Sequence, residues 1–196
     1  MTPDRSFVAA VILLLSATVW AADETVPRGP LPDAVRPERY RLQLDVDPRR
    51  DRFAGQAQIE VTVTRPLRGF WLHGNGLDVR SVTVDAGATR LTGEYVEVEP
   101  VNGVARIELS GEMPAGPATL HIDYTAPFAA GGQGLYRVQV GDDWYAYTQF
   151  EAIDARRAFP GFDEPRFKTP FEVSIVAHAG DRVITNAPLA RTVPGT

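Results

Sequence analysis

The sequence predicts an all-β protein, and three observations point to that class. Apolar and polar residues alternate in several short segments, and this spacing sends every second side chain to one face of a strand. Residues that favour turns separate these segments. No window shows a sustained 3.6-residue period, and 16 Pro and 17 Gly among 196 residues disfavour helices. The pattern predicts an antiparallel sandwich or a large curved sheet.

The alternating segments and the turns between them can be followed along the chain. Apolar residues occupy every second position within residues 40–46, 57–63, 82–84, 96–98, 107–109 and 120–124. The turn signals between these segments are Asp47-Pro48, Asn75-Gly76, Asp85 to Gly87, Asn102-Gly103 and Pro114 to Pro117. Asn102-Gly103 is a hairpin signal because both residue types tolerate positive φ. Together these signals predict a succession of short strands.

Two further segments add detail to the β prediction. The run Gly131-Gly132-Gln133-Gly134 does not end in Lys-Ser/Thr, so it predicts a tight bend and not a phosphate-binding loop. Residues 144–147 (WYAY) place aromatic side chains on both faces of a strand. This pattern predicts that the segment is a buried central strand.

Composition and charge exclude several classes of function. The formal net charge is −5 and no basic face is concentrated in the sequence, which disfavours binding to nucleic acid. The chain contains no Cys, so disulfides and thiolate nucleophiles are absent. The three histidines, His73, His121 and His178, do not have the i, i+4 spacing of a helical zinc site. The sequence therefore predicts no zinc-hydrolase ligand set and no metal site in this chain.

The N-terminus has the features of a secretory signal peptide. An apolar run from Phe7 to Trp20 follows Arg5 and is shorter than the ~20 residues that a membrane-spanning helix needs. We expect a signal peptide over residues 1–21 with cleavage near Ala21-Ala22, a flexible mature N-terminus over 22–30 and one domain over 31–196. An uncleaved membrane anchor is the alternative. Export of a chain without Cys favours a periplasmic or secreted location, with no stable membrane insertion.

Polar residues concentrate between Thr148 and Phe171, where the alternation stops. Eight charged residues are interspersed with Phe and Pro. This composition is expected of a loop that packs against the fold, because fixed Arg–carboxylate pairs satisfy charged groups whose burial would otherwise be costly. Asp163 and Glu164 are adjacent, and adjacent side chains of an extended chain point in opposite directions. We therefore interpret them as part of an ion-paired turn and not as a catalytic acid/base pair.

The same stretch, TQFEAIDARRAFPGFDEPRFKTPFEVSI, closely resembles the signature that closes the N-terminal β-domain of zinc metallo-aminopeptidases related to aminopeptidase N. The resemblance covers roughly Leu31 to the end of the sequence. It includes Leu72-His73, the G-x-Y-R element Gly134 to Arg137, and Val183 to Asn186, which is similar to a strand of the family. It implies a saddle-shaped antiparallel sheet that is incomplete at its C-terminal end, with an open strand edge.

The resemblance also implies where chemistry takes place. Family members hold zinc in a separate thermolysin-like domain with H-E-x-x-H and G-x-M-E-N motifs, and neither motif occurs in this sequence. The E/Q of T-Q-x-E/Q matches Glu151, which the resemblance places beside the α-ammonium of a peptide substrate, with Gln149 as a weaker companion. The expected internal supports of the loop are Asp154, Arg156, Arg157, Asp163 and Glu164. His73 is expected to be a packed or surface histidine and not a ligand. No catalytic residue is expected in this chain.

Two functions remain open from the sequence. The first is the N-terminal substrate-positioning domain of an exported zinc-dependent aminopeptidase, which removes N-terminal amino acids from peptides, inactive without its catalytic domain. The second is a freestanding periplasmic β-sandwich that binds a protein or a glycan. In the second case, exposed aromatic residues such as Trp71 or Trp144 would form the binding platform.

Overall fold

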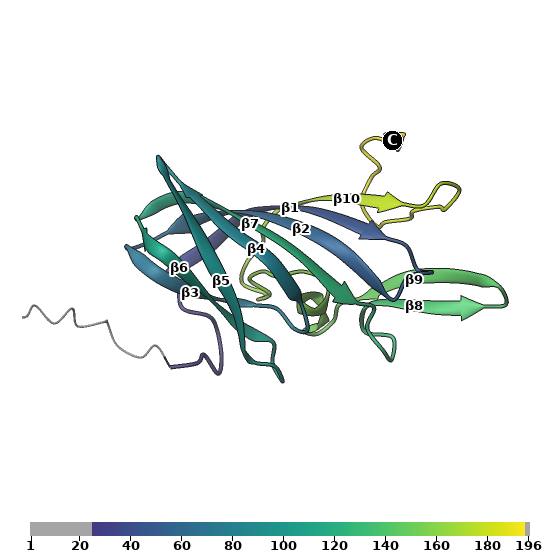
Figure 1. Ribbon diagram of the computed structural model, residues 1–196, viewed down its shortest axis with the longest axis horizontal. Helices are drawn as coiled ribbons and strands as arrows, with labels where there is room; N and C mark the ends of the chain where they lie inside the picture. Colours follow the sequence, from purple (N-terminus) through teal and green to yellow (C-terminus); the bar gives the residue numbers. More distant parts are fainter. Residues whose placement is uncertain (1–24, 195–196) are drawn as a thin grey trace, which may run out of the picture.

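A computed structural model describes residues 25–194, and the expected signal peptide lies outside these residues. Ten strands and one short 3₁₀ helix follow one another along the chain (Figure 1). The strands are β1 (Val35–Val46), β2 (Arg52–Val63), β3 (Leu67–His73), β4 (Asp78–Ala86), β5 (Thr89–Glu99), β6 (Val104–Met113), β7 (Gly116–Pro127), β8 (Gly134–Val140), β9 (Asp143–Gln149) and β10 (Phe171–Ala177), and the 3₁₀ helix is η1 (Asp154–Arg157). The all-β prediction is confirmed.

Eight strands form one curled sheet in the order β10-β1-β2-β7-β4-β5-β6-β3. The architecture is therefore the curved sheet and not two separate stacked sheets. Turns occur where the sequence places them: Gly76, Gly87 and Gly103 all have positive φ, near 60°, at the turns that follow β3, β4 and β5. Gly131, Gly132 and Gly134 also have positive φ, which confirms the tight bend before β8.

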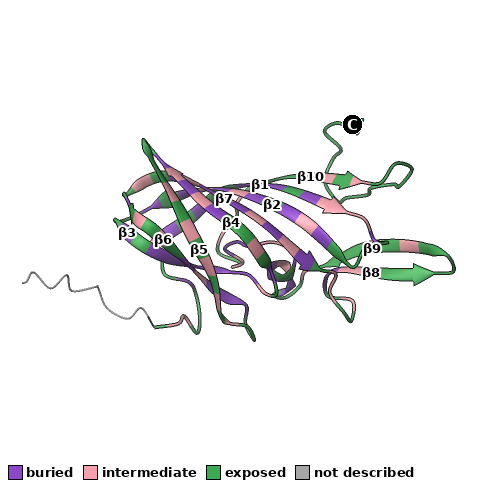
Figure 2. Ribbon diagram, viewed as in Figure 1, coloured by how far each residue is buried: buried purple, intermediate pink, exposed green. Residues whose placement is uncertain are grey.

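Alternation along the strands decides which face of the sheet is buried. Ile59 of β2, Leu120 of β7 and Val84 of β4 are completely buried on the inner face of the curl. The outer face of the same strands is polar and partly exposed, so buried and exposed bands alternate along them (Figure 2). Tyr40 and Tyr124 are the largest of the fully buried side chains and belong to the inner face.

One strand pairing differs from the expected antiparallel arrangement. β10 pairs with β1 in parallel, with Tyr40 opposite Phe171, so the sheet is mixed. A hairpin forces antiparallel pairing, but β10 reaches β1 through a long connection that returns the chain to the end of the sheet where β1 begins. The rings of Tyr40 and Phe171 stack with centroids 4.4 Å apart, which fixes this register.

The aromatic segment 144–147 is not a central strand, so that prediction is wrong. It lies in β9, which pairs only with β8 in a two-stranded ribbon that projects beyond one end of the main sheet (Figure 1). Tyr145 and Tyr147 are 44% and 49% exposed. Aromatic residues on both faces reflect two different surroundings: Trp144 lies against Arg137 on one face, and Tyr145 and Tyr147 are open to solvent on the other.

The segment Val183 to Asn186 is also not a strand in the described part of the chain. It forms no ladder with any other described strand, and Ile184 is 78% exposed. β10 has a partner on one side only, so its outer edge is open within residues 25–194, as the resemblance implied. An extended segment becomes a strand only when a neighbouring strand satisfies its backbone groups, and none lies beside this segment.

Candidate functional site

The loop between β9 and β10 is held against the inner face of the sheet by two buried tyrosines. The Tyr124 hydroxyl donates a hydrogen bond to the Ala158 carbonyl oxygen at 2.8 Å. The Phe162 amide donates to the Tyr40 hydroxyl oxygen, also at 2.8 Å. Burial raises the pKa of both phenols well above the usual value, so both hydroxyls stay protonated. Two strands of the sheet therefore fix the backbone of the loop at two points.

His73 provides a third attachment point. Its backbone exchanges two hydrogen bonds with Gly161, and its Nδ1 accepts a hydrogen bond from the Asp163 amide at 3.1 Å. Burial and the nearby Arg156 guanidinium lower the pKa of His73 to about 4, so the ring is neutral and can accept this bond at neutral pH. His73 is only 4% exposed, which confirms that it is a packed histidine.

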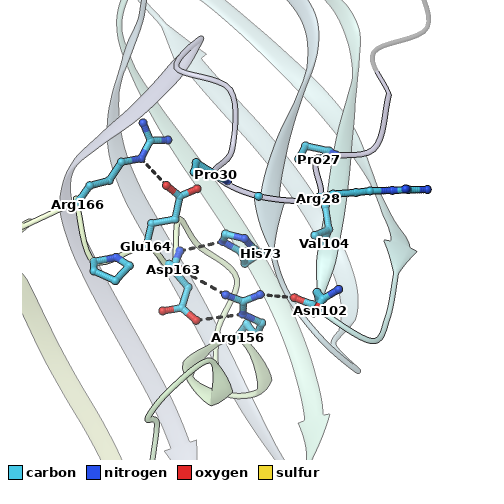
Figure 3. A pocket seen from close by; sticks show the side chains of 12 residues that line it. Pro27, Arg28, Pro30, His73, Asn102, Val104, Arg156, Asp163, Glu164 and Arg166 are labelled. Carbon is cyan, nitrogen blue, oxygen red and sulfur yellow. Dashed lines mark hydrogen bonds and ion pairs between the residues drawn. The ribbon is translucent and has the colours of Figure 1, made fainter.

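The charged residues of the loop form separate ion pairs (Figure 3). The Arg156 guanidinium is buried, donates from Nε to Asp163 Oδ2 at 3.1 Å and also bonds the Asn102 carbonyl oxygen. Glu164 instead pairs with Arg166 and accepts a hydrogen bond from the Leu31 amide. Adjacent Asp163 and Glu164 thus engage different partners, which confirms the ion-paired turn.

An open cavity of about 430 Å³ lies beside these ion pairs (Figure 3). The N-terminal segment 27–30 forms one wall, and His73, Arg156 and Glu164 are among the residues of the other. The polar groups of that second wall already bond one another, so the cavity borders the structural support of the loop.

Glu151 and Gln149, the two predicted substrate-contact residues, lie where the ribbon meets this loop. Gln149 is the last residue of β9, and Glu151 lies in the turn that leads to η1. The peptide bond between Glu151 and Ala152 is cis. Both side chains are exposed, and neither forms a hydrogen bond or ion pair within residues 25–194. Because β9 ends at Gln149, strand alternation does not place the two side chains on one face.

Neighbouring charges do not neutralise Glu151. Arg157, six residues further along the chain, donates to Asp154 Oδ1 at 2.8 Å, and the Asp154 amide bonds the Phe150 carbonyl oxygen. Asp154 is buried, whereas the carboxylate of Glu151 is open to solvent. These contacts confirm Asp154, Arg156, Arg157, Asp163 and Glu164 as internal supports. Glu151 is the acidic side chain of this loop that forms no ion pair within residues 25–194.

The part of the chain that the structure describes contains no group of three or more His, Cys, Asp or Glu side chains that could hold a metal ion. The zinc ion that the resemblance implies therefore does not fit the side chains of residues 25–194. None of the residues from 25 to 194 belongs to an apolar helix of the length that spans a bilayer.

Sequence reasoning missed the residues that hold the loop and the ribbon in place. Tyr40 and Tyr124 occupy inward positions of alternating strands. A buried tyrosine hydroxyl needs a hydrogen-bond partner, and this requirement was the signal that could have identified both residues. Arg137, which contacts the turn after β1, gave no such signal. The G-x-Y-R element includes it, but two of its partners are the backbone carbonyls of Pro48 and Arg50, and every residue carries such a carbonyl.

Comparison with known proteins identifies relatives for this chain. The family model described as the peptidase M1 N-terminal domain matches residues 36–195. A protein named Aminopeptidase M1-C from Oryza sativa subsp. japonica is 32% identical over 91% of this chain and 21% of its own length. Aminopeptidase N from Acetobacter pasteurianus is 29% identical over 85% of this chain and 47% of its own length. Endoplasmic reticulum aminopeptidase 1 from Homo sapiens is 32% identical over 83% of this chain and 18% of its own length.

The match to the family model includes the curled sheet except for Val35, the first residue of β1, and also the β8–β9 ribbon and the ion-paired loop. The chain spans between about a fifth and a half of the length of these three relatives. It belongs to the family of peptidase M1 N-terminal domains.

Proposed function

We propose that this chain is the substrate-positioning part of an exported zinc-dependent aminopeptidase and that Glu151 binds the free α-ammonium of a peptide. The proposal rests on the exposure of Glu151 and on its lack of an ion-pair partner in the described part of the chain. Its carboxylate is exposed and unpaired within the described residues, at the end of a loop whose other acidic side chains are bonded to arginines. The names of the relatives, which are aminopeptidases, support the same assignment.

The chemistry of Glu151 suits this role. An ammonium group carries three donors and a positive charge, so a carboxylate is its natural partner, and charge-assisted hydrogen bonds are about twice as strong as neutral ones. The Gln149 amide oxygen, at the end of the ribbon, can accept a further hydrogen bond. Tyr40, Tyr124 and His73 hold the backbone of the loop in place before a ligand arrives, and an ordered loop lowers the cost of binding.

Peptide-bond cleavage itself is assigned to a catalytic domain outside residues 25–194. In the intact enzyme the zinc ion would supply an activated water. No residue described here is placed to hold that ion, so the contribution of this chain is to bind and orient the peptide. The apolar run within residues 1–21 supports export, with cleavage near Ala21-Ala22, to a periplasmic or extracellular location.

The alternative of a freestanding binding module has less support. Of the two tryptophans considered for its platform, Trp71 is only 5% exposed, and the guanidinium of Arg137 lies 4.5 Å from the ring centroid of the half-buried Trp144. Neither indole is an open stacking surface.

The purified 196-residue chain is expected to show no aminopeptidase activity, because the zinc ligands of the proposed enzyme lie elsewhere. The measurement is release of chromophore from aminoacyl p-nitroanilides with added zinc, with and without a chelator. Robust turnover that the chelator abolishes would contradict the assignment of catalysis to another domain.

In a polypeptide that also carries the catalytic domain, Glu151→Ala is expected to lower kcat/KM for aminoacyl substrates about 10- to 100-fold. Loss of one charge-assisted hydrogen bond accounts for an effect of this size. Glu151→Gln keeps a hydrogen-bond acceptor without the charge. Its kcat/KM should lie between the values of Glu151→Ala and of the parent. Asp142→Asn, which changes an exposed carboxylate in the β8–β9 turn, is the matched control and should have no effect. Unchanged KM and kcat in Glu151→Ala would exclude the proposed role.

A further inference from the structure

The β8–β9 ribbon depends on contacts with the main sheet. It contains two strands of seven residues each and projects beyond the end of the curled sheet (Figure 1). A two-stranded hairpin is only marginally stable in water by itself. Gln149 pairs with Gly134 at the base of the ribbon, so the orientation of the ribbon decides where the chain enters the turn that carries Glu151.

Arg137 makes several of these contacts. From the middle of β8, its Nη1 donates to the carbonyl oxygens of Pro48, at 3.2 Å, and of Arg50, at 2.6 Å. Both acceptors lie in the turn between β1 and β2. Its Nη2 also pairs with Asp51, but that side chain is 90% exposed and such a pair contributes little. The two backbone carbonyls therefore determine the geometry, because they cannot move without moving the β1–β2 turn.

The same guanidinium lies between aromatic rings of two different parts of the fold. It is 4.5 Å from the ring centroid of Trp144 in β9 and 5.9 Å from that of Phe128, which follows β7. Phe128 in turn packs on Phe53 of β2, with ring centroids 5.5 Å apart. Cation–π contacts add to the hydrogen bonds and link both strands of the ribbon to the main sheet.

We infer that Arg137 is a positioning residue: it fixes the β8–β9 ribbon against the β1–β2 turn and thereby sets the position of Glu151. The inference rests on the proposed function of Glu151, although the anchoring of the ribbon does not. The turn that carries Glu151 is then held from both sides, by Arg137 through the ribbon and by Tyr124 through the Ala158 carbonyl. A lysine at this position would not reproduce all the contacts of Arg137, since an ammonium is a point charge without a planar face to stack on the aromatic rings.

Anchoring can be tested on the 196-residue chain by hydrogen–deuterium exchange with mass spectrometry. In Arg137→Met, amides of residues 135–149 are expected to exchange about tenfold faster, whereas peptides from β2 and β7 keep their parent rates. Arg137→Lys should give an exchange rate between those of the parent and Arg137→Met in the same peptides. If Arg137→Met does not fold, the comparison of Arg137→Lys with the parent is the test. Arg90→Met is the matched control, because Arg90 is exposed and its carboxylate contact, Asp85, is 3.7 Å away. Unchanged ribbon exchange, or an equal increase in all peptides, would overturn the inference.

The link to Glu151 is tested by a double-mutant cycle in the polypeptide that carries the catalytic domain. Arg137→Met is expected to raise KM for aminoacyl substrates several-fold, and this effect should vanish when Glu151 is already Ala, since Arg137 then has no carboxylate to position. An equal effect of Arg137→Met in both backgrounds would overturn the link. If Glu151→Ala alone leaves KM and kcat unchanged while ribbon exchange still rises in Arg137→Met, the proposed function fails and the anchoring stands.

Discussion

Gly55→Ala is expected to destabilise the fold by about 3 kcal/mol or more, at the upper end of the usual cost of overpacking a core. Gly55 lies in β2 directly opposite Tyr124 of β7. A Cβ at this position would lie 2.2 Å from Cζ and 2.3 Å from Oη of Tyr124, which is far closer than atoms can approach. Tyr124 is only 1% exposed, so its ring cannot swing into solvent.

The clash at Gly55 would also spread to the candidate site. The phenol of Tyr124 passes over Gly55 to reach the Ala158 carbonyl oxygen, and displacement of the ring breaks that buried hydrogen bond. An unsatisfied buried carbonyl costs roughly 1–3 kcal/mol by itself. Gly55→Ala should therefore loosen the loop after β9 as well as the sheet.

Urea unfolding followed by far-UV circular dichroism measures the effect of Gly55→Ala. Gly29→Ala is the matched control, because no heavy atom lies within 4 Å of the Cβ that it adds. We expect the control to unfold at the urea concentration of the parent and Gly55→Ala well below it. Equal urea midpoints for the parent, Gly55→Ala and Gly29→Ala would contradict the close contact between Tyr124 and Gly55 of β2.

Lowering the pH from 6.5 to 4 is expected to destabilise the fold through His73. The pKa of His73 is about 4 in the folded protein, against 6.5 for an unperturbed histidine. As the pH falls below 6.5 the unfolded chain takes up a proton that the folded chain does not. The free energy of unfolding then decreases by about 1.4 kcal/mol per pH unit until the folded state also binds the proton near pH 4. The total loss is about 3 kcal/mol, and the stabilisation is fully present above pH 6.5.

His73→Asn isolates this contribution. The Asn Oδ1 can accept the hydrogen bond from the Asp163 amide that His73 Nδ1 accepts, but it does not titrate. The free energy of unfolding of the parent should fall more steeply than that of His73→Asn between pH 6.5 and 4. His178→Asn serves as the control, because this histidine is exposed. Parallel pH dependence in the parent and His73→Asn would contradict the buried, neutral state of His73.

Much of the fold could be predicted from local patterns. Alternation over residues 57–63 identified the buried face of β2, and Asn102-Gly103 marked the hairpin between β5 and β6. These features depend on residues close together in sequence, and the physical rule for each is local. The ion-paired turn at Asp163 and Glu164 was predictable for the same reason, although the identity of the partners was not.

The environment of the aromatic segment could not be predicted in this way. Trp144 and Tyr145 alternate as they would in a central strand, yet one lies under Arg137 and the other is half exposed. Period-2 alternation shows that the two faces differ in what they contact, but it does not show what covers them. Trp144 lies against Arg137, and Arg137 bonds the β1–β2 turn, 87 and 89 residues away in the sequence. The parallel pairing of β10 with β1 was missed because its long connection imposes no direction.

The sequence by itself determined the strand content, the turns, the family resemblance and the absence of a zinc-ligand pattern, since each is written in spacing or in residue type. Only the tertiary structure decided that Glu151 is free while the loop's other carboxylates are paired. Whether a charge is neutralised depends on distances of a few ångströms. The three pairs join side chains two to seven residues apart, so the conformation of the loop decides these distances. Those distances are set here by the buried hydroxyls of Tyr40 and Tyr124, which satisfy their hydrogen bonds only when the loop lies against the sheet.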